Sequence, residues 1–134
     1  MPALELQTLD GRPLRLSGGP GKGKSTLLFF LSPSCPVCKR LLPVLQAIRN
    51  SEAGWLEIVL AGDGDKKEHR AWLKAQGMES WPYVLSPQLG MTMRVGQLPF
   101  AALVDESGIL LARNPVNNAE QIESMLGERY NEMA

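Results

Sequence analysis

Cysteine and histidine are scarce in this chain of 134 residues, which holds two cysteines and one histidine. Two thiols exclude a scaffold held by several disulfides, and they cannot complete a structural zinc site without other ligands. The only histidine, His69, lies in the polar run KKEHRAW, which predicts a solvated helix residue rather than a metal ligand or catalytic base. We therefore expect neither a disulfide-rich fold nor a metal site.

Net charge and long apolar runs are also lacking. The 14 Lys and Arg residues balance the 14 Asp and Glu residues, so no field steers the chain onto nucleic acid or an anionic bilayer. The chain has no apolar run of about 18 residues, and the opening MPALEL lacks the pattern of a secretory signal. With 44% hydrophobic residues it can bury a core, and we expect one domain over residues 1–134.

The first half of the chain predicts a hairpin, a strand and a helix. The opening LELQTLDGRPLRL has two short alternating runs joined by Asp10-Gly11, which is typical of a β-hairpin. The apolar run at 26–31 is followed by Pro33, which favours a six-residue strand over a helix. Apolar residues at helical spacing then predict a helix over 37–50.

Strands and helices alternate again in the second half. Asp65 with Glu68 resembles a capping box that opens a helix ended by Gly77, and Asn118 with Gln121 is expected to cap a helix over 119–130. The remaining expected elements are strands at 56–61, 83–85, 100–104 and 109–113 and a short helix at 88–95.

The two cysteines form the motif C-P-V-C at the turn between the first buried strand and the first helix. Free N–H groups and the macrodipole at a helix N-terminus favour a thiolate, so Cys35 is the predicted nucleophile. Cys38 lies on the same helix face and is predicted to be more buried and to resolve the mixed disulfide. Pro36 and Val37 separate the cysteines without adding charge. The alternatives are an inert disulfide, which is a weak staple because its loop is so short, and a metal site.

A second signal is Gln97-Leu98-Pro99, which precedes the apolar strand FAALV. A proline at the first position of a strand is explained by a tight turn with a cis bond, the alternative being an ordinary trans proline. We expect Pro99 to lie opposite Cys35 and cover the sulfurs. The backbone beside Leu98 is then expected to pair with a substrate strand.

With these residues in place, the chain resembles thioredoxin-fold proteins along nearly its whole length. The resemblance rests on C-P-V-C, on Pro43 five residues beyond Cys38, on Pro99 before a strand and on the D-E-S-G hairpin. It implies an α/β thioredoxin-like fold, with a central mixed β-sheet flanked by helices and an extra N-terminal hairpin. Pro43 would be the proline that kinks the first helix, and no cofactor is implied.

Three segments resemble, within that fold, the accessory protein of methylamine dehydrogenase maturation: FFLSPSCPVCKRLLP, TLDGRPLRL and ARNPVNNAEQIESML. Those proteins are similar to membrane-anchored, periplasmic thiol-disulfide oxidoreductases. The resemblance implies a protein substrate with cysteines, namely the methylamine dehydrogenase light subunit with its several disulfides and tryptophan-derived quinone. It also implies a membrane redox partner. The membrane anchor would lie outside this chain, and this chain would be the soluble domain.

The chain departs from the thioredoxin pattern around its cysteines. Ser34 stands where many thioredoxins carry Trp. The buried acid of thioredoxin would fall at Phe29, and the corresponding Glu of the cytochrome-maturation reductases at Leu41. With no carboxylate between Thr26 and Ser51, the sequence offers no local proton acceptor for Cys38, and water or a client group are the alternatives.

One motif points elsewhere, because residues 18–25 fit the phosphate-binding pattern G-x-x-x-x-G-K-[ST]. That motif needs a strand, a loop and then a helix, and Pro33 leaves only a helical stub after Lys24. We interpret the segment as a flexible turn, with nucleotide binding as the alternative.

The predicted function is thiol-disulfide exchange on exported proteins. The alternatives are a reductase for cytochrome c maturation, a peroxidase with Ser32 three residues before Cys35, and a non-catalytic assembly module. Trp81, Tyr83 and Leu98 would contact a partner if exposed, although core packing is the expected role of all three. Nothing in C-P-V-C selects between reductant, oxidant and isomerase.

Overall fold

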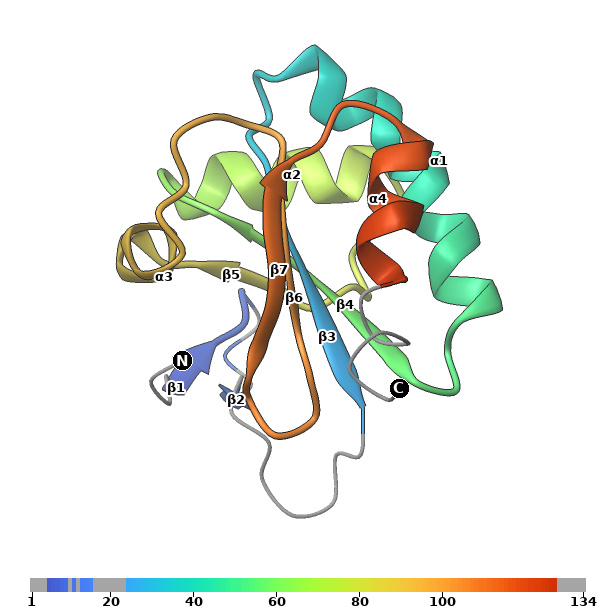
Figure 1. Ribbon diagram of the computed structural model, residues 1–134. Helices are drawn as coiled ribbons and strands as arrows, with labels where there is room; N and C mark the ends of the chain where they lie inside the picture. The colour runs from blue at the N-terminus through green and yellow to red at the C-terminus, as the bar shows by residue number, and fades with distance from the viewer. Residues whose placement is uncertain (1–4, 10, 12, 16–23, 128–134) are drawn as a thin grey trace.

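The computed structural model describes residues 5–9, 11, 13–15 and 24–127. Strands and helices alternate from residue 25 to residue 104; two further strands precede this stretch, and one strand and one helix follow it (Figure 1). In chain order they are β1 (Glu5–Gln7), β2 (Pro13–Arg15), β3 (Ser25–Phe30), α1 (Pro36–Ser51), β4 (Leu56–Gly62), α2 (Lys66–Ala75), β5 (Tyr83–Leu85), α3 (Pro87–Thr92), β6 (Phe100–Val104), β7 (Leu110–Pro115) and α4 (Ala119–Leu126).

The main sheet is mixed and has the strand order β5-β4-β3-β6-β7. Strand β3 pairs in parallel with β4 and antiparallel with β6, while β4 and β5 are parallel and β6 and β7 antiparallel. The expected central mixed sheet flanked by helices is therefore confirmed.

The predicted N-terminal hairpin is also confirmed, with β1 antiparallel to β2 and Leu6 opposite Leu14. The segment after β1 reaches the main sheet, where Thr8 bridges to Val84 and the Leu9 N–H donates to the Tyr83 carbonyl at 2.8 Å. These contacts cover the outer edge of β5, which would otherwise present unpaired backbone groups.

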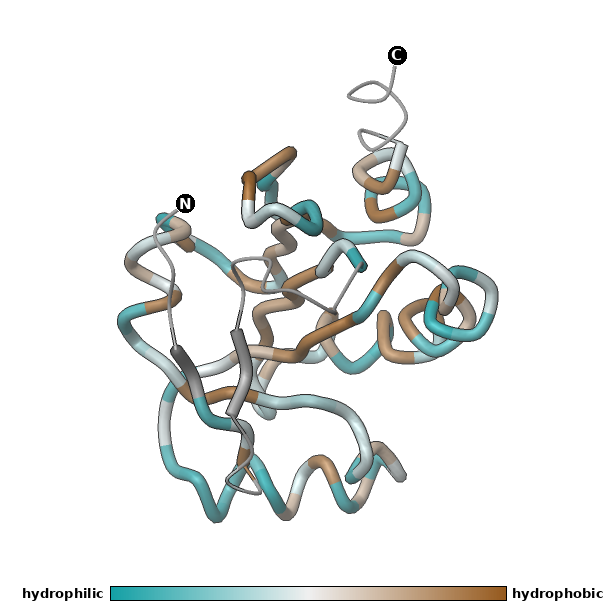
Figure 2. The backbone as a smooth tube through the Cα atoms, turned by 90° about the horizontal axis from the view of Figure 1, so that it is seen from below, coloured by the Kyte–Doolittle hydropathy of each residue, from teal (hydrophilic) through white to brown (hydrophobic). Residues whose placement is uncertain are grey.

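The central strands form because their side chains are apolar on both faces, as expected for strands covered by helices. In β3, Leu27 and Phe29 face one core cluster and Leu28 and Phe30 face the other. The first cluster packs with buried residues of α1, α2 and α4, and the second with α3. Figure 2 shows brown, hydrophobic strand segments in the middle of the molecule, whereas the helices contain both teal and brown segments.

Short side chains cap the helices as the sequence predicts. Asp65 accepts from the Lys67 N–H at 3.2 Å, and Asn118 accepts from the Gln121 N–H at 2.9 Å. Gln121 in turn accepts from the Asn117 N–H rather than from that of the N-cap residue. Helix α4 ends at Leu126, and the last residues of the predicted helix lie outside the described part of the chain.

The alternative of a phosphate-binding loop requires a helix after Lys24, but the structure has strand β3 there. Lys24 leads directly into β3, and Ser25 is buried in that strand opposite Leu56. Residues 18–23 of the motif lie outside the described residues. A strand at this point removes the helix N-terminus on which phosphate binding by such a loop depends.

Candidate active site

The two cysteines lie at the end of the sheet where β3 finishes and β6 begins. Phe30 pairs with Phe100, so the segment after β3 and the residue before β6 meet at the same end. The Cys35 N–H donates to the Ser32 carbonyl at 3.1 Å, which turns the chain from β3 into α1. Register and turn together bring Cys35, Cys38 and Pro99 to one end of the molecule.

Cys35 is the N-cap residue of α1, with extended backbone angles, and is half-buried. Its sulfur accepts a hydrogen bond from the Cys38 N–H at 3.2 Å. The first turn of α1 contains no acidic residue, and Lys39 and Arg40 next to it are exposed. The cap position therefore provides a sulfur that solvent can reach, with one backbone N–H donating to it.

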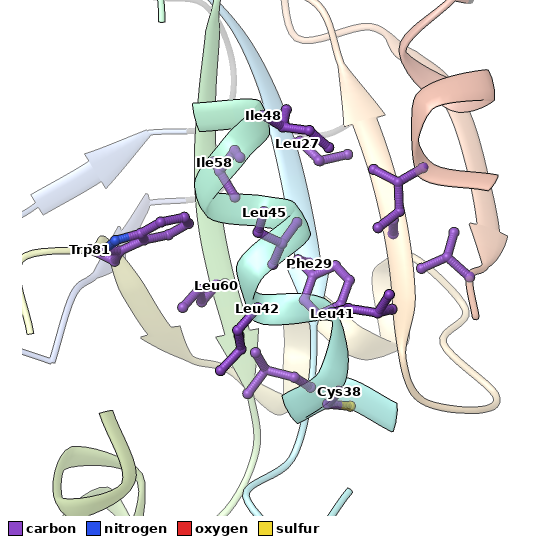
Figure 3. Packing of buried hydrophobic residues seen from close by; sticks show 14 of the residues in the cluster. Leu27, Phe29, Cys38, Leu41, Leu42, Leu45, Ile48, Ile58, Leu60 and Trp81 are labelled. Atoms are coloured by element: carbon purple, nitrogen blue, oxygen red, sulfur yellow. The ribbon is translucent and has the colours of Figure 1, made fainter. Parts of the chain in front are cut away.

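Cys38 lies on the buried face of α1, and both cysteines are free thiols. Figure 3 shows its sulfur at the N-terminal end of α1, in line with the buried leucines of that helix. Burial raises the pKa of Cys38 to about 12, and the side-chain hydrogen bond with Cys35 acts in the same direction. A backbone hydrogen bond with Ser32 lowers it by less. The sequence prediction of one accessible and one buried cysteine is confirmed.

The three predicted supporting residues lie on α1. Pro36 is exposed in the first turn, where a missing N–H costs nothing, and Val37 is partly buried against the core. Pro43 lies inside the helix with an exposed ring. Because proline has no N–H, the bond that would reach back to the carbonyl of Lys39 is missing from α1.

The peptide bond between Leu98 and Pro99 is cis, as the sequence indicates. Pro99 is buried, and its carbonyl accepts from the Val116 N–H at 3.1 Å. Leu98 is 43% exposed, so the expectation that it packs in the core is wrong. The side chain lies instead on a groove of about 410 Å³ between α3 and the ends of β3 and β4, where Met91 is also exposed.

Trp81 and Tyr83 are buried in the core, which confirms the packing role expected of both. Arg49 lies over the Trp81 ring at 4.5 Å from its centroid. Phe29 and Leu41, at the positions where related folds carry an acid, are buried apolar residues. Among the described residues, the buried polar and charged side chains are Thr8, Ser25 and His69, so this part of the core contains no carboxylate.

The prediction that His69 is solvated is wrong, because the side chain is only 2% exposed. Its Nδ1 is hydrogen-bonded to the Tyr83 hydroxyl, and its Nε2 lies 3.1 Å from the Asp63 carbonyl oxygen. The charged residues next to His69 in the sequence made a solvent-exposed side chain the expected result, and the burial of His69 was therefore not predicted. The available signal was Leu73 four residues later, since residues at that spacing share a helix face.

No group of three or more His, Cys, Asp and Glu side chains suited to a metal ion occurs among the described residues. Within the same residues, none of the helices combines the length and the apolar character that crossing a membrane requires.

Comparison with known families matches residues 1–129 to the AhpC/TSA family. The methylamine utilization protein MauD of Paracoccus denitrificans is 38% identical over 125 residues, which are 93% of this chain and 62% of that protein. MauD of Methylobacillus flagellatus is 32% identical over 124 residues, 92% of this chain and 60% of that protein. The chain thus spans about three fifths of the length of these relatives.

Among solved structures, the exposed lipoprotein thioredoxin of Streptococcus pneumoniae superposes with a TM-score of 0.80 at 24% identity, covering 95% of this chain and 99% of that one. A thiol:disulfide interchange protein DsbE from Chlorobium tepidum gives a TM-score of 0.78 at 19% identity, covering 93% and 91%. These similarities establish a thioredoxin-like fold.

Proposed function

The chain belongs to the AhpC/TSA family, and on that premise we propose that it is a thiol-disulfide oxidoreductase acting on exported proteins through Cys35 and Cys38. The observation that supports this most directly is the pair of free thiols at the start of α1, one half-buried and hydrogen-bonded, the other buried within the same turn. An accessible sulfur can attack a protein disulfide, and a buried one is protected until the first bond has formed.

In the reducing direction, the Cys35 thiolate attacks a client disulfide. A bond forms between Cys35 and one client sulfur while the client disulfide breaks, and the released client thiolate takes a proton. Cys38 then loses its proton and attacks the Cys35 sulfur, which releases the second client thiolate. The client gains two electrons and two protons, and the protein is left with a disulfide between Cys35 and Cys38. The same steps in reverse donate a disulfide.

Leu98 and Pro99 are the proposed contacts for the client backbone. The exposed side chain of Leu98 beside the groove offers a polypeptide an apolar surface, and the backbone at this position would pair with the client strand. Pro99 lies at the end of the sheet from which α1 and its cysteines begin. A client segment seated along Leu98 would therefore run past the cysteine end of the molecule.

The relatives named methylamine utilization proteins suggest the client. We assign this chain to maturation of the methylamine dehydrogenase light subunit in the periplasm, with a membrane redox partner that renews the thiols or the disulfide. A membrane anchor would belong to the full-length protein. The sequence resemblance and the MauD matches support this assignment. The chain itself covers about three fifths of the length of those relatives.

Trapping tests the proposal. Cys38→Ser removes the resolving thiol, so Cys35 is expected to remain joined to a client carrying a disulfide, as a covalent complex that reductant dissolves. Mass spectrometry of the complex identifies the client cysteine, and Cys35→Ser serves as the matched control that should trap nothing.

Four results would contradict this function. Failure of Cys38→Ser to trap any disulfide-bearing light subunit removes the proposed client. Clients carrying C-x-x-C-H would indicate cytochrome c maturation, and peroxide consumption without protein exchange would indicate a peroxidase. A Cys35→Ser, Cys38→Ser double variant that still supports maturation would leave only the assembly module. A redox titration in glutathione buffers then gives the direction of electron flow.

A further inference from the structure

The hydrogen-bonded pair of His69 and Tyr83 is buried in the same core as Cys38. The two side chains are 2% and 1% exposed, and Tyr83, Cys38, Phe29 and Leu60 belong to one cluster. His69 comes from α2 and Tyr83 from β5, so two consecutive elements build the pair. A buried imidazole bonded to a buried phenol is costly to form unless both polar ends are satisfied.

Hydrogen bonding determines which nitrogen of His69 carries its proton. The Asp63 carbonyl can only accept, so the Nε2 at 3.1 Å must donate to it. Nδ1 of the neutral ring is then an acceptor, and it receives the Tyr83 hydroxyl proton. The ring is therefore held in a form that can take up one further proton, at the nitrogen that faces Tyr83.

The pair and Cys38 flank the same peptide unit. Tyr83, Leu60 and Phe29 lie in one row across β5, β4 and β3, on the face that α1 covers. A Cβ on Gly62 would lie 3.2 Å from both the Tyr83 hydroxyl and the Leu31 carbonyl oxygen. The other end of the peptide that begins with that carbonyl is the Ser32 N–H, and the backbone of Ser32 lowers the pKa of Cys38.

The charge on Cys38 also affects the pKa of Tyr83. The pKa of Tyr83 is raised, chiefly by burial and further by the negative charge that Cys38 carries when deprotonated. A carboxylate does not occur among the buried residues in the described part of the chain, and His69 is the buried side chain there with a basic ring nitrogen. Among these residues, its imidazole is the acceptor available to a thiol that must lose a proton to react.

We propose that the Tyr83–His69 pair accepts the proton that Cys38 loses when it attacks the mixed disulfide at Cys35. This inference rests on the proposed thiol-disulfide exchange and assigns it a proton acceptor. Gly62 is part of the device, because a side chain at that position would separate the pair from the Leu31 carbonyl.

The S–H bond of Cys38 breaks as its sulfur bonds to the Cys35 sulfur, and the bond from Cys35 to the client sulfur breaks. The proton passes to the Tyr83 oxygen while the Tyr83 proton moves to Nδ1 of His69. The client leaves as a thiolate, and the imidazolium then returns its proton, through Tyr83, to that thiolate or to water.

The other ionisable groups around the pair are exposed. Asp63, Asp65 and Glu68 lie beside His69, and Arg70, Lys74 and Glu79 line the cavity on the far side of Tyr83. Because solvent screens exposed charges of both signs, Cys38 on α1 is the buried ionisable group expected to respond to the pair most strongly.

A single-turnover reaction with an aromatic disulfide tests the inference. Attack by Cys35 releases a first coloured thiolate, and attack by Cys38 on the resulting mixed disulfide releases a second. Tyr83→Phe and His69→Gln are each expected to slow the second release by at least about tenfold and to leave the first unchanged. Arg70→Gln, an exposed change on the same helix, is the matched control and should alter neither.

The wild-type protein supplies a test that needs no variant. His69 is the single histidine, so its ring signal in a proton NMR titration gives its pKa without assignment. The rate of the second release should change with pH around that value. Unchanged second release in both variants, equal slowing of both releases, or a pH profile unrelated to His69 each overturns the inference. Absence of any second release in the wild type would instead refute the proposed function.

Discussion

At the scale of single residues, the missing side chain of Gly62 matters as much as the side chains around it. A Cβ there would lie 2.9 Å from Cε1 of His69 and 3.2 Å from the Leu31 carbonyl oxygen. Since the backbone of Gly62 is in the ordinary extended strand β4, the requirement for glycine comes from packing. The close approach joins β4, α2 and β5 at one point.

Gly62→Ala is therefore expected to destabilise the protein by about 1–3 kcal/mol, because the His69 ring must move from a well-packed position. Chemical denaturation measures the change in the free energy of unfolding. Gly90→Ala is the matched control, since nothing lies within 4 Å of a Cβ at that helical position, and it should stabilise by about 0.5–1 kcal/mol. Equal effects of the two substitutions would show that packing at Gly62 is unimportant.

At the scale of elements, the starts of α2 and α4 agree with the capping signals in the sequence. Capping depends on one side chain and a backbone N–H two or three residues away, so the signals at Asp65 and Asn118 can be recognised without the fold. The strands and α1 were predicted for a similar reason, because apolar periodicity is local. The strands at 83–85 and 100–104 have the expected ends, whereas several other ends differ by one residue or more, as for β3 at Ser25–Phe30 instead of 26–31, since fraying and register depend on neighbours.

Asn118→Ala is expected to lower the free energy of unfolding by about 1 kcal/mol, because the Gln121 N–H loses its acceptor at the start of α4. Thermal or urea unfolding gives the value. Asn117→Ala provides the comparison, since only its backbone N–H is used, in a bond to Gln121, and a change below about 0.5 kcal/mol is expected. A larger loss for Asn117→Ala would mean that this loop is held by contacts other than the cap.

At the scale of the whole molecule, the candidate site could be predicted only in part. Cys35, Cys38 and Pro99 were found because they stand in short motifs at element boundaries. His69 was misjudged because its burial depends on β5, whose Tyr83 lies 14 positions away in sequence. Leu98 was misjudged because a residue before a buried strand can face the core or solvent, and only the packing of α3 decides which.

Stability of the whole molecule is expected to depend on pH through Cys38. Burial raises the pKa of this thiol from 9.0 to about 12, so the folded state favours the protonated form. The contribution is complete below about pH 9 and is lost as pH rises toward 12, because the unfolded state releases its proton first. Unfolding free energies of Cys35→Ser should therefore fall more steeply over this range than those of Cys35→Ser, Cys38→Ser. Parallel slopes would contradict a buried neutral thiol.

The N-terminal hairpin also protects the strand that carries Tyr83. Its trailing segment pairs with β5 through Leu9 and the Tyr83 carbonyl, and Tyr83 faces the core that holds Cys38. Because β5 is the outermost strand of the main sheet, a chain without this segment would leave the β5 edge open to pairing with a second molecule. The hairpin therefore works against edge-to-edge association at this strand.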